Sequence, residues 1–341
     1  MTTVQTSAGP DLSVSYLGLD LSGPIVISAG PGTGDVYSML RLQDAGAAAV
    51  VLPSLFQEEV EAEEFAASDI MNIGDSFVEF ESAPLSEVDT SGYGPDRHVR
   101  LVAEAKAALK IPVIASVNAS HKGGWARYAT MMADAGADAV ELNLYAVNTD
   151  PSQDAGFVEA QKLEVIEGVK HAIDVPLAVK ISQNFQSLSN FAARARDAGA
   201  DGLVLFNRFF GPDIDLEELT VNPQISLSTS TELRLRMRWI GILRSQMPGY
   251  SLAATGGVHT ADDVVKTLLV GANVACVTSA VLLNGTGYVA DLLQGTRSWL
   301  AEREYESVKQ LCGSMSAGSV GNPAEFERAQ YMKAITSWSN G

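Results

Sequence analysis

A single lysine interrupts an otherwise apolar run near the middle of the chain. The segment 177–181 reads LAVKI, and Lys180 is its only charged residue. An ammonium group is costly to bury unless it meets an anionic or electron-rich partner. We therefore predict that Lys180 has a functional role, in contact with a ring or an anion.

Amide side chains end three other apolar runs, and an amide can both donate and accept hydrogen bonds at the edge of a heterocycle. These residues are Asn118, Asn143 and Asn207. A further run ends in the small residues Ser28, Ala29 and Gly30, which let a flat ring or a phosphate approach the backbone. Together they indicate a site for a planar ring with several polar edges.

Glycines and hydroxyls close the last two apolar runs. They are Gly256, Gly257, Thr278 and Ser279. Barrel enzymes often bind phosphate with such loops after their seventh and eighth strands, next to the start of a short helix. A phosphate tail on a planar ring with carbonyls and ring nitrogens is most simply FMN, which is the cofactor we expect.

The elements that position these residues repeat along the chain. The phrases DAGAAAVVL, DAGADAVEL and DAGADGLVL begin at residues 44, 134 and 197, and a looser copy, VGANVACVT, begins at residue 270. Each phrase indicates a helix that ends at its glycine, followed by a strand buried on both faces. Four more strand-like runs lie at residues 23–30, 111–118, 175–182 and 250–257. These parallel strands predict a closed (β/α)8 TIM barrel over about residues 23–297, with its chemistry at the carboxyl ends of the strands.

Length, composition and charge limit the class of protein. The 341 residues, of which 46% are hydrophobic, fit one α/β domain over 1–341. The net charge of −18 argues against nucleic acid as a partner, because phosphate backbones need clustered lysine and arginine. Without a signal sequence or an apolar run of membrane length, we expect a cytoplasmic protein with no membrane contact. Cys276 lies inside the last strand and is interpreted as a buried structural thiol.

Two stretches fall outside the repeat. Residues 57–97, between the second and third strands, carry the acidic run EEVEAEEF and more chain than a crossover helix needs. We interpret them as a lid-like insertion, with a solvated helix face as the alternative for the acidic run. Residues 298–341 form a predicted C-terminal helical extension, which closes the barrel or makes a subunit contact. We expect a homodimer.

Several segments follow the pattern of one known family. They are YLGLDLSGPIVISAG at residues 16–30, the loop from Asn143 to Asn148, Lys180, and the loops at 256–257 and 278–280. On these segments nearly the whole chain resembles dihydroorotate dehydrogenases. The resemblance implies that FMN is held by Asn118, Asn143, Lys180, Asn207, Gly256, Gly257, Thr278 and Ser279, with Asn143, Asn148 and Asn207 also near the substrate.

The substrate side departs from the family pattern. The family reads N-x-S-C/S-P-N after the fourth strand, with the Cys or Ser as base, and here Ala146 and Val147 replace the base and the proline. The second strand ends in Pro53 and Ser54 without the family's lysine, and residues 71–97 hold no counterpart of its N-S-M-G-L-P-N segment. General base catalysis contributes roughly 10²–10⁴-fold, so we expect feeble oxidation of dihydroorotate.

Neighbouring side chains are candidates for the missing proton chemistry. Tyr145 and His121 are the candidate catalytic residues, with Tyr93 as a further donor, because each can supply a proton beside a C=C bond that receives a hydride. Each also has a plain alternative as a hydrogen-bonded loop residue or a surface residue. Arg208 can clamp a substrate carboxylate or pair with the acidic stretch 57–97.

These observations predict an FMN-dependent oxidoreductase acting on CH–CH groups, which moves a hydride between flavin N5 and a C–C or C=C bond of a small carbonyl-activated substrate. The resemblance implies a place in pyrimidine metabolism. One alternative is a sugar-phosphate lyase or isomerase with Lys180 as a Schiff-base amine, and another is a flavin-binding protein without its own turnover. No metal site, iron–sulfur cysteine cluster or nicotinamide fingerprint is expected, so the electron donor or acceptor is left open.

Overall fold

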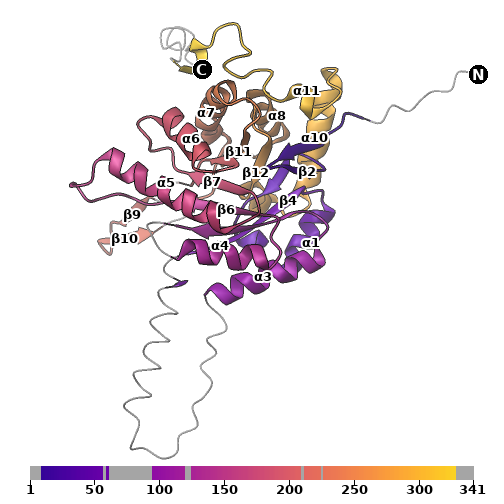
Figure 1. Cartoon of the computed structure of the whole chain (residues 1–341). Helices are drawn as coiled ribbons and strands as arrows, with labels where there is room; N and C mark the ends of the chain where they lie inside the picture. The colour runs from indigo at the N-terminus through magenta and orange to yellow at the C-terminus, as the bar shows by residue number, and fades with distance from the viewer. Residues whose placement is uncertain are drawn as a thin grey trace, which may run out of the picture.

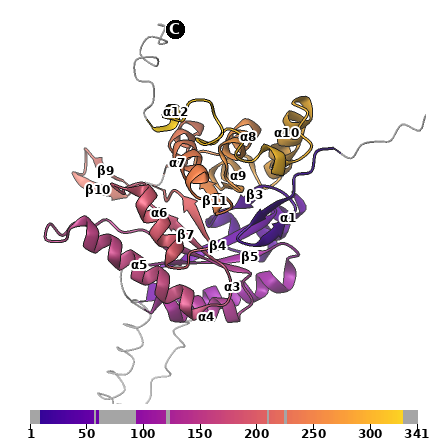
Figure 2. The same cartoon turned by 45° about the horizontal axis from the view of Figure 1, so that its top comes forward.

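The computed structural model describes residues 9–56, 59–60, 94–119, 124–208, 211–223 and 226–327. At its centre, eight parallel strands close into a barrel in the order β11-β12-β3-β4-β5-β6-β7-β8, with helices around it (Figure 1, Figure 2). The predicted (β/α)8 barrel is therefore confirmed. The barrel strands are β3 (Ile25–Ile27), β4 (Ala49–Leu55), β5 (Val113–Asn118), β6 (Ala139–Leu144), β7 (Leu177–Ile181), β8 (Gly202–Leu205), β11 (Ser251–Thr255) and β12 (Val274–Val277).

Helices separate the barrel strands along the chain, as the repeated phrase predicts. Gly46, Gly136, Gly199 and Gly271 follow α1, α4, α6 and α8 with φ angles of 99°, 103°, 101° and 113°. Glycine adopts this left-handed backbone without a steric penalty, which explains why every copy of the phrase keeps its glycine. The outer helices are α1 (Val36–Asp44), α3 (Pro95–Ala108), α4 (Trp125–Asp134), α5 (Ala155–Ala172), α6 (Leu188–Asp197), α7 (Leu233–Gln246), α8 (Ala261–Val270) and α10 (Tyr288–Glu302).

In three copies of the phrase, the residue two positions after the glycine is polar. Its side chain connects one β-α repeat to the next. Asp138 accepts a hydrogen bond from the backbone N–H of Val113 at 2.7 Å, and Lys106 Nζ lies 2.7 Å from the same oxygen. Asp201 and Asn273 take this place in the later copies and accept from backbone N–H groups of β7 and β11. The repeated side chain therefore fixes the start of one strand against the next repeat.

Removing the Asp138 carboxylate is expected to destabilise the barrel. In Asp138→Ala the Val113 N–H loses its acceptor and Lys106 loses its ion-pair partner. A hydrogen bond to a charged group contributes about 1.5–3 kcal/mol, so the free energy of unfolding should fall by roughly that amount in chemical denaturation. The control is Asp174→Ala at an exposed position, which should stay within about 0.5 kcal/mol of the wild type. An equal fall in the free energy of unfolding in the two variants would contradict the proposed role of Asp138 in connecting the repeats.

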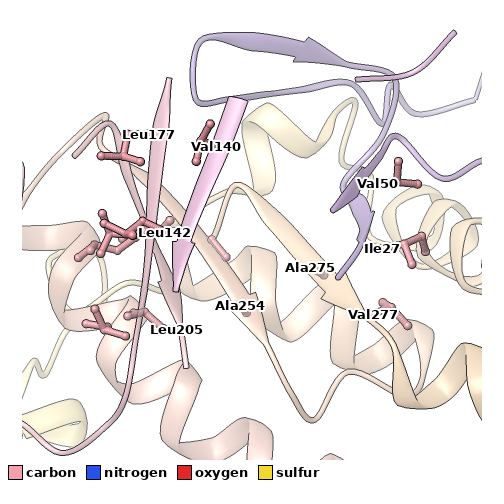
Figure 3. Packing of buried hydrophobic residues seen from close by; sticks show 14 of the residues in the cluster. Ile27, Val50, Val140, Leu142, Leu177, Leu205, Ala254, Ala275 and Val277 are labelled. Carbon is pink, nitrogen blue, oxygen red and sulfur yellow. The ribbon is translucent and has the colours of Figure 1, made fainter. Parts of the chain in front are cut away.

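Alternate strand residues form two buried clusters. One contains outward-facing residues such as Ile27, Val140 and Leu205, which pack with helix residues (Figure 3). The other contains inward-facing residues and a hairpin of β1 (Val14–Tyr16) and β2 (Leu19–Leu21). Leu17 in the turn of this hairpin donates its backbone N–H to Ser251 Oγ, at the start of β11, at 2.9 Å. The hairpin therefore covers the mouth at the amino ends of the strands and leaves the opposite mouth for ligands.

The sequence prediction included neither the β1–β2 hairpin nor a second hairpin after β8. A hairpin of β9 (Pro212–Asp215) and β10 (Thr220–Pro223) follows β8 and projects from the side of the barrel (Figure 1, Figure 2). Its turn, residues 216–219, reads LEEL and lacks the Asn-Gly or Asp-Gly pair that marks a two-residue hairpin turn. The two short strands, PDID and TVNP, therefore give no strand signal in the sequence.

The two predicted additions to the barrel are described only in part. Of the lid-like stretch 57–97, only 59–60 and 94–97 belong to the described residues, and 95–97 open α3, so the lid stays a prediction. Of the extension 298–341, residues 298–327 are described and hold the end of α10, α11 (Val308–Leu311) and α12 (Ala324–Glu327). A Cβ added at Gly241 of α7 would lie 2.5 Å from the Phe326 ring, so α12 packs closely on α7.

The single-domain description and the homodimer also stay predictions. No helix within the described ranges is long and apolar enough to cross a membrane.

Candidate active site

Two cavities adjoin at the carboxyl ends of the barrel strands. We call the first, of about 410 Å³, the barrel cavity; its lining includes Phe206, Thr255 and Cys276. The second, of about 500 Å³, is the rim cavity; residues 145–148, 182–186 and the start of α5 line it. Arg208 lines both. The predicted cofactor residues that line the barrel cavity are Ser28, Ala29, Gly30, Lys180, Gly256, Gly257, Thr278 and Ser279.

The three predicted amides lie beside the barrel cavity without lining it. Asn118, Asn143 and Lys180 are register partners across β5, β6 and β7, so they stand in one row on one face of the sheet. Asn207 lines the rim cavity, and its Nδ2 donates to the carbonyl oxygens of Leu144 and Lys180, each at 3.4 Å. The amides therefore stand at the edges of the two cavities.

The side-chain oxygen of Asn143 has no hydrogen-bond partner in the described part of the chain, although it is buried. Leaving a buried acceptor unsatisfied typically costs about 1–3 kcal/mol. Nearly all such groups in folded proteins are paired. The oxygen therefore requires a donor that the described residues do not supply, which is what a bound heterocycle with ring N–H groups offers.

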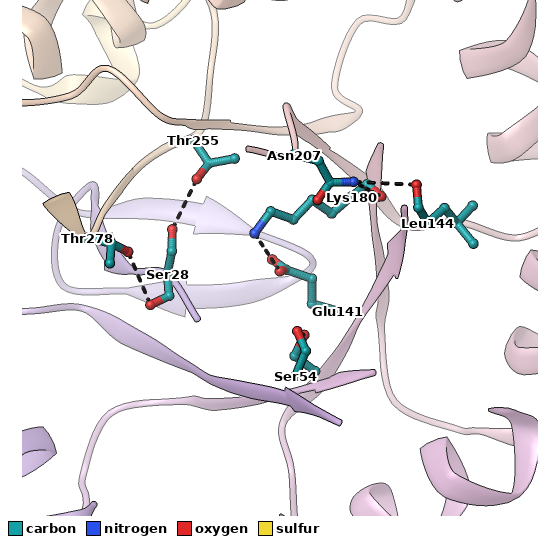
Figure 4. A network of polar contacts seen from close by, with 9 residues as sticks. Ser28, Ser54, Glu141, Leu144, Lys180, Asn207, Thr255 and Thr278 are labelled. Atoms are coloured by element: carbon teal, nitrogen blue, oxygen red, sulfur yellow. Dashed lines mark hydrogen bonds and ion pairs between the residues drawn. The ribbon is translucent and has the colours of Figure 1, made fainter. Parts of the chain in front are cut away.

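Lys180 has an anionic partner inside the barrel. Its Nζ lies 3.2 Å from Glu141 Oε1, and the two side chains are only 11% and 4% exposed (Figure 4). The sequence analysis expected a partner for Lys180 but considered only a ligand. It therefore missed Glu141. The signal was present, because Glu141 is the only charged residue in β6 and stands two positions before Asn143 on the same face of the strand.

Hydroxyl groups surround this ion pair. Ser28 Oγ lies 3.2 Å from Thr255 Oγ1, and Thr278 Oγ1 donates to the Ser28 carbonyl oxygen at 3.4 Å (Figure 4). On the other side, Ser54 Oγ lies 2.6 Å from Ser116 Oγ. The side chains inside the barrel at the level of the ion pair are thus polar, and they form hydrogen bonds mostly with one another.

Cys276 belongs to the same layer and lines the barrel cavity. Burial, with the negative charge of Glu141 as a smaller cause, raises the pKa of its thiol to about 12. The thiol therefore stays protonated at neutral pH and is a poor nucleophile. This fits the structural role predicted for Cys276.

The loops after β11 and β12 form the end of the barrel cavity predicted to hold phosphate. Gly256 and Gly257 have φ angles of 84° and 90°, and a Cβ at Gly257 would lie 2.5 Å from the backbone nitrogen of Leu233. Only glycine therefore fits this close approach. Ser279, which begins α9 (Ser279–Asn284), accepts at its Oγ from the Ser228 backbone N–H at 3.1 Å.

A buried arginine, missed by the sequence analysis, lies beside these loops. Arg236 lines the barrel cavity and donates Nε to the Thr255 carbonyl oxygen at 3.0 Å. Burial lowers the pKa of its guanidinium, the charge of Glu232 partly offsets this effect, and the like charge of Arg208 adds a further lowering. Arginine nevertheless stays charged in proteins. Arg236 is paired with Glu232, whose Oε2 lies 3.8 Å from its Nη2, so Arg208 contributes more than Arg236 to the positive charge on this side of the cavity.

The rim cavity brings together most of the predicted substrate residues. Tyr145, Ala146, Asn148, Asn207 and Arg208 all line it. The structure therefore places Ala146, which has no ionisable group, on the cavity wall. His121 and Tyr93 lie outside the described residues, so their proposed roles remain predictions.

Two cations face the rim cavity. Arg208 makes no hydrogen bond or ion pair with any residue that the structure describes. Lys162, on α5, was missed because the sequence analysis examined strand ends alone. Burial lowers the pKa of Lys162, and the charge of Glu159 partly opposes this. Two cations on one cavity wall favour an anionic ligand. The alternative that Arg208 pairs with the acidic stretch 57–97 stays open, because most of that stretch lies outside the described residues.

Comparisons with known proteins agree with this arrangement. Residues 93–300 match the family model described as dihydroorotate dehydrogenase. This match covers more than half of the chain, so the protein belongs to the dihydroorotate dehydrogenase family and is an oxidoreductase of that family. The resemblance noted in the sequence is confirmed.

Individual relatives align along most of the chain. The catalytic subunit of dihydroorotate dehydrogenase B (NAD(+)) from Thermoplasma acidophilum is 27% identical over 311 residues, which cover 89% of this chain and 98% of that protein. The NAD-dependent dihydropyrimidine dehydrogenase subunit PreA from Escherichia coli is 25% identical over 346 residues, covering 92% and 79% of the two chains. The chloroplastic dihydropyrimidine dehydrogenase (NADP(+)) of Arabidopsis thaliana is 23% identical over 334 residues, covering 89% and 76%.

Proposed function

We propose that the protein is an FMN-dependent oxidoreductase that transfers a hydride between flavin N5 and a CH–CH or C=C bond of a small carbonyl-activated substrate. The observation that carries the proposal is the convergence on one cavity of Lys180, the glycines after β11 and the hydroxyls after β12. The family membership supports the same chemistry.

The residues present fit FMN. Gly256, Gly257, Thr278 and Ser279 would hold the phosphate, because backbone N–H groups and hydroxyls suit its oxygens. Lys180, Asn118 and Asn143 would face the ring, with the unpaired oxygen of Asn143 available to a ring N–H. Small side chains at Ala29 and Gly30 leave room for the flat ring. When bound, FMN supplies the hydride chemistry, and the chain supplies position and charge.

The substrate would occupy the rim cavity, next to the barrel cavity. Asn148 and Asn207 can hydrogen-bond carbonyl and N–H groups of a planar substrate, as Asn143 can from the strand beside them. Arg208, with Lys162 across the same cavity, would bind a carboxylate. Tyr145 can give a proton to the carbon that neighbours the site of hydride addition, a role for which Ala146 has no group.

The alternative of a Schiff-base lysine is disfavoured by a specific contact. A Schiff-base lysine must present its amine to a substrate carbonyl, whereas Lys180 Nζ is held by the buried carboxylate of Glu141 at 3.2 Å. A flavin-binding protein without turnover differs from the main proposal in one measurable property. Its flavin would not be reduced by any carbonyl-activated donor.

Purified protein is expected to be yellow and to release FMN on denaturation. The test is a visible absorbance spectrum of the native protein, followed by chromatographic identification of the released cofactor. Protein that holds no flavin after riboflavin-supplemented expression and incubation with excess FMN would contradict the proposal. Protein that releases FAD, with no affinity for FMN, would contradict the cofactor assignment alone.

A further inference from the structure

The buried ion pair of Glu141 and Lys180 lies at the floor of the barrel cavity. Lys180 lines the cavity, whereas Glu141 lies beneath it and is 3% exposed. The carboxylate reaches Lys180 from the neighbouring strand at 3.2 Å. The described groups next to the pair are neutral. Ser116 is the register partner of Glu141 on β5, and the buried Tyr16 phenol and the protonated Cys276 thiol lie close enough to interact with the Glu141 charge.

Stability does not account for this pair. Two charges taken out of water lose about as much hydration energy as they gain in mutual attraction. An apolar pair of similar volume would therefore stabilise the barrel equally well. A lone Lys180, in contrast, would present a full positive charge to whatever fills the cavity, and Glu141 is placed to compensate that charge.

We propose that Glu141 is a positioning residue that acts through Lys180. Its carboxylate holds Nζ at the cavity floor and offsets the ammonium charge, and it thereby sets the relative affinity of the site for oxidised and reduced FMN. The inference rests on the proposed function, because it takes FMN as the occupant of the barrel cavity.

The direction of the effect follows from charge. Reduction makes the flavin ring more electron-rich, so a nearby cation favours the reduced cofactor and a nearby anion disfavours it. Glu141→Gln keeps the size of the side chain and removes its charge, which leaves the Lys180 cation uncompensated. The ratio of affinities for reduced and oxidised FMN should rise about tenfold or more, and tenfold is about 30 mV for a two-electron couple.

The test measures the midpoint potential of bound FMN at pH 7, by equilibration with a reference dye, in the full-length holoprotein. Glu141→Gln should shift the potential to more positive values, and Lys180→Met should shift it to more negative values. If Glu141 acts through Lys180, adding Glu141→Gln to Lys180→Met should change the potential little, because no ammonium is left for the carboxyl to hold or offset.

Ser251→Ala is the matched control. It removes a buried hydroxyl that accepts from the Leu17 backbone N–H at the opposite mouth of the barrel, away from the ion pair, so its potential should equal the wild-type value. A wild-type potential in Glu141→Gln, with FMN bound, would overturn the inference. Should Glu141→Gln not fold, Glu141→Asp retracts the charge by one methylene and should give a smaller positive shift; no shift there would also overturn it.

The two proposals fail in different ways. Wild-type protein that binds no FMN contradicts the proposed function and this inference together. Wild-type protein that binds FMN, with a potential insensitive to Glu141, contradicts only the role of Glu141.

Discussion

Dihydroorotate is expected to reduce the bound flavin very slowly, and Ala146→Cys is expected to accelerate this reaction about 10²-fold or more. Ala146 lies on the wall of the rim cavity, where the family pattern has a Cys or Ser that removes a proton. General base catalysis contributes roughly 10²–10⁴-fold, so its absence leaves hydride removal without a proton acceptor. Anaerobic stopped-flow bleaching of the flavin measures both rates.

A matched control separates base chemistry from the mere presence of a thiol. Val147→Cys places the same group one residue further along the loop, at a position that is 72% exposed, and should give no gain. Rapid bleaching of the wild-type flavin by dihydroorotate would show that another residue acts as base. Equal increases in the rate of flavin reduction in the two cysteine variants would show that a thiol at position 146 does not act as the base.

The absent base also bears on the direction of the reaction. Adding a hydride to a C=C bond requires a proton donor at the neighbouring carbon and not a base. Tyr145, next to Ala146 on the same cavity wall, carries a phenolic O–H that can donate a proton. The loop is therefore better suited to reducing an activated double bond than to oxidising dihydroorotate.

The barrel could be predicted because its signals are local. Each strand is a short run buried on both faces, and the helices before β4, β6, β8 and β12 end at a glycine with positive φ, as at Gly136 and Gly199. Lys180 could be singled out for the same reason, since one charged residue in a buried run needs a partner wherever the strand lies. The candidate cofactor residues were placed at the carboxyl ends of the strands by the barrel geometry, and eight of them line the barrel cavity.

The parts that were missed depend on contacts between distant residues. Glu141 and Lys180 are 39 positions apart, and only the alignment of β6 with β7 brings them together. Lys162 and Arg236 reach the cavities from helices, where an apolar stripe gives no sign of which polar residue faces a ligand. The β9–β10 hairpin escaped because its turn lacks a typical turn sequence. In each case the deciding information is register or packing, which the order of residues encodes only indirectly.

A carboxylate-bearing ligand is expected to bind the rim cavity much more tightly than its neutral amide, and Arg208 is expected to carry most of the difference. Arg208 lines both cavities, so its guanidinium is placed to meet a carboxylate of a ligand there. A hydrogen bond to a charged group contributes about 1.5–3 kcal/mol, which is about 10- to 150-fold in affinity. Perturbation of the flavin spectrum by orotate and by orotamide gives the two dissociation constants.

In Arg208→Gln the preference for orotate over orotamide should largely disappear, while the affinity for orotamide changes little. Arg238→Gln removes the same charge from an exposed position of α7 that lines neither cavity, and should leave the preference intact. Added salt should weaken orotate binding in the wild type, because the attraction is screened. Equal affinities in the wild type, or a preference that survives in Arg208→Gln, would show that the substrate carries no anion at this position. Tight binding of orotate combined with slow reduction by dihydroorotate would have one simple cause: the rim cavity keeps a cation that binds the carboxylate but lacks the base that oxidation requires.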